Sequence, residues 1–264
     1  MKPLLLIFAW RRPRHLYVTL KNVLRLRGLE RYDLLVFFDG DCDPMGPKIC
    51  RDLDVPYETR PHRLGNRQHI VKGLEDSFQE TRETVYIEED MLLRADALDY
   101  LETVTKLSYM FCCLQQWNTW HPAMLPQFIR KARQAWDSLK REVNWYIPRG
   151  NRLRREDFLA LSAYLAHKDY LGKEVPGHPG AQMTDELWNH DAFFTRYMLD
   201  TGRMTLLPPK DYLLHFGTNG TSACGSKAIE REMFSGDPNT WTDNVLRVYQ
   251  EHPEAFEKIG FEYL

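Results

Sequence analysis

The sequence has no apolar run that approaches the roughly 18 residues of a membrane-spanning helix. The first apolar stretch, Leu4 to Trp10, is short and precedes Arg11-Arg12-Pro13 rather than a small-residue cleavage site. We therefore expect a buried strand there and not a signal peptide. Charge of one sign is also lacking: the 264 residues carry a net charge of −2, which gives no general attraction to nucleic acid or anionic membranes.

Cysteine is scarce and shows no pattern. The sequence has five cysteines, an odd number: Cys42, Cys50, Cys112, Cys113 and Cys224. Cys112 and Cys113 are adjacent. Their spacing fits neither a disulfide framework nor a zinc site. We expect reduced thiols in a cytoplasmic protein. The histidines other than His215, among them His69 and His190, show no joint metal-ligand spacing, so we expect them to be exposed or hydrogen-bonded.

Several catalytic and cofactor motifs are missing. The sequence has no GxxxxGK[ST], which excludes a P-loop ATPase, and no GxGxxG after its first strand, which argues against a dinucleotide-binding domain. HExxH and GxSxG are absent as well, so the sequence gives no support to a zinc protease or a serine hydrolase of those types.

An ordinary globular composition is present, with 43% hydrophobic residues in segments of alternating strand-like and helix-like spacing. In the first half we expect strands at 4–10, 33–38, 54–58, 84–87 and 110–115, helices at 13–24, 65–80 and 95–107, and a loop around Pro44 and Pro47. This order predicts an α/β fold with a mixed, mostly parallel sheet flanked by helices. In the less regular second half we expect helix at 127–145, a mobile basic loop at 146–155, helix or strand at 158–167, and helix at 184–201.

The stretch VYIEED, which ends in Glu88, Glu89 and Asp90, stands out because three acids follow an apolar strand and precede MLL. Adjacent like charges are costly to bury unless a cation meets them. Polar residues also follow the strands that end at Trp10 and Phe38, and in parallel sheets ligands bind at the carboxyl ends of the strands. Carboxylate oxygens, completed by phosphate and water, are the usual Mg²⁺ ligands. The acids therefore indicate a metal-diphosphate site.

At this point the sequence resembles a known family. VYIEEDMLL resembles the strand and acidic triplet of GT-A-fold glycosyltransferases, in the style of N-acetylglucosaminyltransferase I and the family 2-like nucleotide-sugar transferases, although the triplet is Glu-Glu-Asp where Glu-Asp-Asp is typical. FAWRRPRHLYVTL, LLVFFDGD, GNRQHIVKGL, FCCLQQWN and LLHFGTNGTS resemble further family segments in the expected order. The resemblance spans roughly residues 3–225.

The resemblance implies a role for each matching position. It implies one domain over 1–264, in which 1–118 bind the nucleotide sugar and 119–264 form the acceptor side. It implies that Asp90 and His215 hold Mn²⁺ or Mg²⁺, and that Trp117 and Asn118 face the acceptor. The implied donor-binding residues are Ala9, Trp10, Arg11, Asp39, Arg67, Glu88 and Glu89.

The chemistry of sugar transfer calls for the same parts. Negative charge develops on the leaving phosphate, where a divalent ion and arginines stabilise it. The acceptor hydroxyl must lose a proton, so an inverting enzyme needs a carboxylate base. Asp185 and Glu186, which precede Trp188, are the first candidates for this base, and Asp191 is a third. Each of these acids is equally explained as a residue that caps the start of a helix.

We expect a metal-dependent, inverting glycosyltransferase that uses a UDP-sugar and transfers a hexosyl or N-acetylhexosaminyl group. The acceptor stays open between a glycan, a protein, a small molecule and modified bases of nucleic acid. A nucleotidyltransferase is an alternative, although WRRPRH lacks the Gly-rich loop typical of that class. The second alternative is a non-catalytic protein that uses the same fold to bind sugar or nucleic acid.

Overall fold

Within the described residues the chain builds one large sheet and one small one. The structure, a computed structural model, describes residues 1–114, 142–143, 150–176, 180–185, 190–217 and 227–252. The large sheet is eight-stranded, in the order β3-β2-β1-β4-β8-β6-β9-β7. Its strands are β1 (Leu4–Ala9), β2 (Asp33–Phe38), β3 (Tyr57–Thr59), β4 (Glu83–Glu88), β6 (Phe111–Cys113), β7 (Glu142–Val143), β8 (Asn151–Arg154) and β9 (Thr205–Leu206).

Most of the large sheet is parallel, as expected. β1 pairs in parallel with β2 and β4, and β2 with β3, whereas β8 runs antiparallel to β4 and β6, and β7 antiparallel to β9. In this register Ala9 lies opposite Phe38, and Phe8 lies opposite Glu88. The carboxyl ends of β1, β2 and β4 therefore meet at one edge of the sheet.

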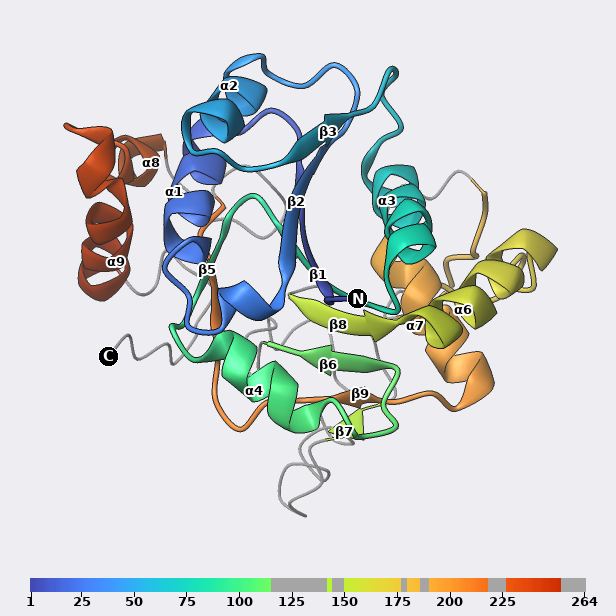
Figure 1. The fold of residues 1–264 in the computed structure, drawn as a ribbon. Coiled ribbons are helices and arrows are strands. Elements are labelled where there is room, and N and C mark those ends of the chain that lie inside the picture. Colours follow the sequence, from blue (N-terminus) through green and yellow to red (C-terminus); the bar gives the residue numbers. More distant parts are fainter. Residues whose placement is uncertain (115–141, 144–149, 177–179, 186–189, 218–226, 253–264) are drawn as a thin grey trace.

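Helices cover both faces of the sheet (Figure 1), because alternate residues of each central strand point to opposite sides. One face packs on α1 (Pro13–Val23), α2 (Met45–Asp52) and α4 (Ala97–Val104). The other packs on α3 (Asn66–Glu80), α6 (Arg155–His167) and α7 (His190–Thr201). Leu5 and Ile7 of β1 lie in the first core, and Leu6 and Phe8 in the second.

The second sheet has two strands, the first of which follows the carboxyl end of β4. β5 (Met91–Leu93) pairs antiparallel with β10 (Leu213–His215), so that His215 lies opposite Met91. The amide of Phe216 donates to the carbonyl of Asp90 at 2.9 Å. Leu92, Leu214 and Phe216 then form a third core with Val18 of α1 and with α8 (Lys227–Met233) and α9 (Trp241–Glu251), which lie beside α1 in Figure 1. The 3₁₀ turns are η1 (Leu29–Arg31) and η4 (Pro238–Thr240).

Several expectations for local structure were wrong. Residues 151–154 are a strand and not part of a mobile loop: Arg152 is 4% exposed and pairs with Glu83, and its guanidinium donates to the carbonyl of Leu101 at 3.1 Å. The region around Pro44 and Pro47 is helical rather than loop, since proline is tolerated in the first turn of a helix. Residues 142–143 form a strand, and the rest of the predicted helix at 127–145 lies outside the described residues.

Within the described residues, the predicted helix at 184–201 is observed over His190–Thr201. Thr184 and Asp185 are not helical, and 186–189 lie outside the described residues. In the described residues, Cys42, Cys50, Cys112 and Cys113 are free thiols, and no helix is long and apolar enough to cross a membrane. The assignment of 1–264 to one domain with two functional halves stays a prediction.

Candidate active site

The acids at the end of β4 are met by an arginine from the turn after β1. Arg12 donates from Nε to Glu89 Oε1 at 2.9 Å, and its Nη1 pairs with Asp90 Oδ2. The backbone amide of Trp10 donates to the other oxygen of Glu89 at 2.6 Å. Glu89 and Asp90 are 4% and 1% exposed, so this is a buried ion-pair network. Arg12, which lies next to the predicted Arg11, supplies the charge that the triplet required.

Of the three acids, Asp90 is the one whose pKa is lowered. Burial by itself raises the pKa of its carboxyl, but Arg12 and then His215 more than offset this and hold the pKa well below its usual value. His215 Nε2 lies 3.0 Å from Asp90 Oδ2, as the β5–β10 pairing requires. The pKa of Glu88, by contrast, is raised to about 7, first by burial and then by the charge of Asp90. Burial also raises the pKa of Glu89.

The surroundings of Asp90 fit a divalent cation. Asp90 Oδ1 is buried and has no hydrogen-bond partner among the described residues, which leaves one carboxylate oxygen for a ligand. A Cβ at Gly217 would overlap Asp90 Oδ2 and lie 2.9 Å from Arg12 Nη1, so only glycine leaves room above the carboxylate. The described residues hold no group of three or more His, Cys, Asp or Glu side chains that would bind a metal by themselves. Asp90 and His215 would need phosphate and water oxygens to complete the shell, which is the usual Mg²⁺ pattern.

Two arginine side chains lie close to the ring of Trp10, the residue that follows β1. The guanidinium carbons of Arg11 and Arg63 lie 4.8 Å and 4.2 Å from the centre of the Trp10 ring. Arg11 also pairs with Asp41, and both side chains are about half exposed, at 48% and 58%. Arg11 thus lies at the surface of the site, whereas Arg12 lies inside it.

The carboxylate of Asp39, at the end of β2, is occupied by backbone amides. Oδ1 accepts from Gly40 at 2.9 Å and from Leu64 at 2.7 Å, and Oδ2 accepts from Gly65 at 2.9 Å. Asp39 is 3% exposed. It ties the segment before α3 to the carboxyl end of the sheet, and its predicted contact with the nucleotide stays a prediction.

Arg67 and Asp185 lie together on the α3–α7 side. Arg67 Nη2 donates to the carbonyl of Asp185 at 2.9 Å, and its guanidinium lies 4.5 Å from the centre of the Phe193 ring. The Asp185 carboxylate is partly exposed and accepts hydrogen bonds from Lys168 and Tyr170, which lower its pKa. A carboxylate with two such partners is less available as a base.

A buried histidine that the sequence pattern did not single out lies at the start of α7. His190 is 2% exposed; its Nδ1 lies 2.7 Å from Asn66 Oδ1, and its Nε2 lies 3.0 Å from Asp191 Oδ1. Both His190 and Asp191 also act electrostatically on Glu88. The start of α7 therefore lies at the acidic edge of the sheet.

The structure brings many of the predicted residues to this edge. Trp10 contacts Glu89, His215 contacts Asp90, and Arg12 joins the two acids. Asp191 acts electrostatically on Glu88. Ala9 ends β1 opposite Phe38, next to them. Glu186, Trp117 and Asn118 lie outside the described residues. The missed residues are Arg12, Asn66, His190 and Gly217; the sequence indicated an arginine after the first strand but not which of Arg11 and Arg12 pairs with the acids.

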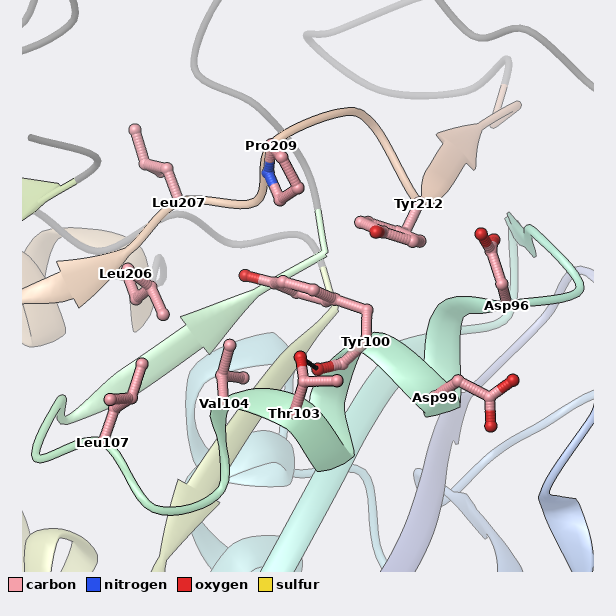
Figure 2. A pocket seen from close by; sticks show the side chains of 10 residues that line it. All are labelled: Asp96, Asp99, Tyr100, Thr103, Val104, Leu107, Leu206, Leu207, Pro209 and Tyr212. Atoms are coloured by element: carbon pink, nitrogen blue, oxygen red, sulfur yellow. Dashed lines mark hydrogen bonds between the residues drawn. The ribbon is translucent and has the colours of Figure 1, made fainter. Parts of the chain in front are cut away.

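A separate hollow, shown in Figure 2, lies over α4. It has a volume of about 510 Å³ and apolar walls that include Val104, Leu206 and Pro209. The stacked rings of Tyr100 and Tyr212, 4.5 Å apart, also line it. It lies at the other end of the β5–β10 pair from His215 and contains none of the predicted site residues.

The architecture and the acidic edge together define the GT-A glycosyltransferase fold. The solved structures that share it include the following two. A mannosyltransferase from Pyrobaculum calidifontis, in complex with GDP-Man and Mn²⁺, matches with a TM-score of 0.52 and 12% identity over 97% of this chain and 76% of its own. TarS from S. aureus (residues 1–349) matches with a TM-score of 0.52 and 11% identity over 95% of this chain and 72% of its own. No family model and no curated protein matches the sequence.

Proposed function

We propose that the protein is a metal-dependent glycosyltransferase, which moves a sugar from a nucleoside-diphosphate donor to an acceptor hydroxyl. The observation that carries the proposal is the state of Asp90, a buried carboxylate whose Oδ1 has no hydrogen-bond partner among the described residues and which lies under Gly217. This arrangement occurs at the carboxyl end of a strand in a fold that two glycosyltransferases share, one of them in complex with GDP-Man and Mn²⁺.

In this proposal Asp90 and His215 hold Mn²⁺ or Mg²⁺. The bound ion would stabilise the charge that develops on the leaving diphosphate. Arg12 and the exposed Arg11 provide cations at the same edge, and an arginine fork suits phosphate oxygens. Glu89 acts through Arg12 and the Trp10 amide, which it holds in place, rather than through the donor.

The finer assignments also belong to the proposal. Arg67, Glu88 and Asp39 remain candidates for contacts with the donor, beside Ala9 and Trp10. We keep UDP as the expected nucleotide, and the GDP-Man bound by the P. calidifontis enzyme makes GDP the first alternative to test. Inversion, with a carboxylate base, is expected, and the transferred group is a hexose or N-acetylhexosamine. The proposed acceptor is a glycan, a protein, a small molecule or a modified base of nucleic acid, and the proposed location is the cytoplasm.

The test is calorimetric titration of UDP, GDP and dTDP into the protein, with Mn²⁺ and with EDTA. We expect one nucleotide to bind only with Mn²⁺, and Asp90→Ala to abolish this binding. Asp243→Ala is the matched control, because Asp243 is exposed and lies in the first turn of α9. Binding that is equal in EDTA would leave a metal-independent binding protein, and Mn²⁺-dependent binding retained in Asp90→Ala would show that Asp90 is not the metal ligand. Turnover of a nucleoside triphosphate with a sugar phosphate, without sugar transfer, would indicate a nucleotidyltransferase.

A further inference from the structure

His190 is buried between two oxygen atoms. The Oδ1 of Asn66, from the first turn of α3, lies 2.7 Å from its Nδ1, and the Oδ1 of Asp191 lies 3.0 Å from its Nε2. The edge of the ring packs on Phe194, with the ring centres 5.4 Å apart. Contacts on both ring nitrogens and on the ring itself fix the orientation of the imidazole.

The groups around the ring favour its protonated form. Oxygen atoms of a carboxylate and of an amide carbonyl accept hydrogen bonds and do not donate them. An oxygen near each ring nitrogen suits a ring that carries a hydrogen on both nitrogens, so we expect an imidazolium. Burial lowers the pKa of His190, but Asp191 and Glu88, the charged groups that face it, outweigh burial and raise the pKa overall. A buried cation thus lies beside the Asp191 carboxylate.

This pair lies where an acceptor base is needed. His190 contacts Asn66 at 2.7 Å, and the preceding residue, Gly65, donates its amide to Asp39 at the carboxyl end of β2, so the start of the described part of α7 lies at this edge of the sheet. The Asp191 side chain is 25% exposed, so it is open to a substrate, whereas that of His190 is 3% exposed. The rival Asp185 is bound to Lys168 and Tyr170.

We propose that Asp191 is the catalytic base and that His190 is its positioning residue, an inference that rests on the proposed function. In the step, the Asp191 carboxylate takes the proton of the acceptor hydroxyl. The hydroxyl oxygen forms a bond to the anomeric carbon of the donor sugar. The bond between that carbon and the diphosphate oxygen breaks, and its electron pair leaves with the diphosphate. His190 holds the carboxylate oriented toward the acceptor, as the orienting member of a catalytic triad does for its histidine.

The test uses the full chain and the glucose, mannose and N-acetylglucosamine derivatives of the nucleotide selected by the calorimetric screen, and measures release of nucleoside diphosphate with water as the acceptor. A general base contributes about 10²- to 10⁴-fold, so Asp191→Asn should lower kcat by at least about 100-fold while donor affinity changes little. Asp243→Asn, the same change in the first turn of α9, should leave kcat unaltered. If Asp185→Asn abolishes turnover and Asp191→Asn does not, the inference is wrong.

The positioning role is tested by His190→Gln and His190→Leu. Glutamine keeps an N–H donor but carries no charge, so we expect a loss of about 10-fold in kcat, with a larger loss for leucine and no change in KM for the donor. A merely structural His190 would instead lower stability and leave kcat of the folded protein unchanged in both variants.

Two further readouts separate failure of this inference from failure of the proposed function. The ¹⁵N chemical shifts of the His190 ring should report an imidazolium at pH 7 in the wild type and a neutral ring in Asp191→Asn, whether or not the enzyme turns over. A neutral ring in the wild type overturns the inference and leaves the proposed function intact. A wild type that binds no nucleotide with Mn²⁺ overturns both.

Discussion

Removal of the Arg12 charge should lower the free energy of unfolding of the metal-free protein more than removal of the exposed Arg11 charge at the same edge. In Arg12→Gln the buried Glu89 and Asp90 lose the cation that pairs with both. Breaking a buried ion pair by removing one partner costs about 3–5 kcal/mol. Because the Arg12 side chain is 28% exposed, we expect the lower end, about 3 kcal/mol in the free energy of unfolding.

Mn²⁺ should restore much of this loss. In the wild type Arg12 Nη1 occupies Asp90 Oδ2, so a metal ion competes with the guanidinium for the carboxylate. In Arg12→Gln this competition is absent, and Mn²⁺ supplies the missing positive charge. A ligand that binds only the folded state adds about 2.7 kcal/mol at one hundred times its Kd. The variant should therefore gain more stability from Mn²⁺ than the wild type does.

The assay is urea unfolding of both proteins in EDTA and in Mn²⁺, followed by fluorescence and by circular dichroism. Arg11→Gln is the matched control: its partner Asp41 is 58% exposed and Arg11 is 48% exposed, so its loss should change stability far less. A loss below about 1 kcal/mol for Arg12→Gln in EDTA would refute the view that this ion pair stabilises the buried acids. An equal gain from Mn²⁺ in the variant and the wild type would show that the ion does not compete with Arg12 for Asp90.

Two more predictions follow from single residues. Gly217→Ala should weaken metal-dependent nucleotide binding by about 10-fold or more in calorimetry, with the fold retained, because the added Cβ would overlap Asp90 Oδ2. His69 is buried and its pKa is lowered to about 4 by burial, against 6.5 for an ordinary histidine. The unfolded chain thus binds the extra proton first as pH falls, so stability that is complete above pH 6.5 is lost progressively down to pH 4. For a shift of this size the loss is about 3 kcal/mol, and unfolding midpoints of His69→Gln should lack this part of the slope. An unchanged slope in the variant, or unchanged nucleotide affinity in Gly217→Ala, would contradict these expectations.

The parts of the fold that the sequence predicts well are those whose burial follows directly from a short apolar run. Residues 33–38 form the predicted strand, and the helix at 65–80 is observed from Asn66. The failures lie where tertiary contacts decide. Arg152 lies between Asn151 and Leu153 in a basic segment, and distant partners such as Glu83 and Leu101 make its burial in β8 favourable. No local pattern contains those partners.

The candidate site divides in the same way. The acids of VYIEED were identifiable because three adjacent charges between apolar flanks need an explanation. The choice between Arg11 and Arg12 was not, since the two are adjacent and only the turn after β1 decides which faces inward. His190 was unidentifiable because its partner Asn66 is 124 positions away in the sequence. Spacing rules find ligands that share an element, and this site is assembled from the ends of different elements.

The assignment of separate partners to the three acids explains why the triplet tolerates a glutamate at its second position. Asp90 carries the unpartnered oxygen and faces His215 and Gly217. Glu88 lies toward His190 and Asp191. Glu89 reaches back across the chain to the Trp10 amide and to Arg12 Nε, at 2.6 Å and 2.9 Å. The side chain at this position spans the distance to the turn after β1. The second acid therefore positions the cation that neutralises the third, and the triplet combines a structural carboxylate with one that is open to a ligand.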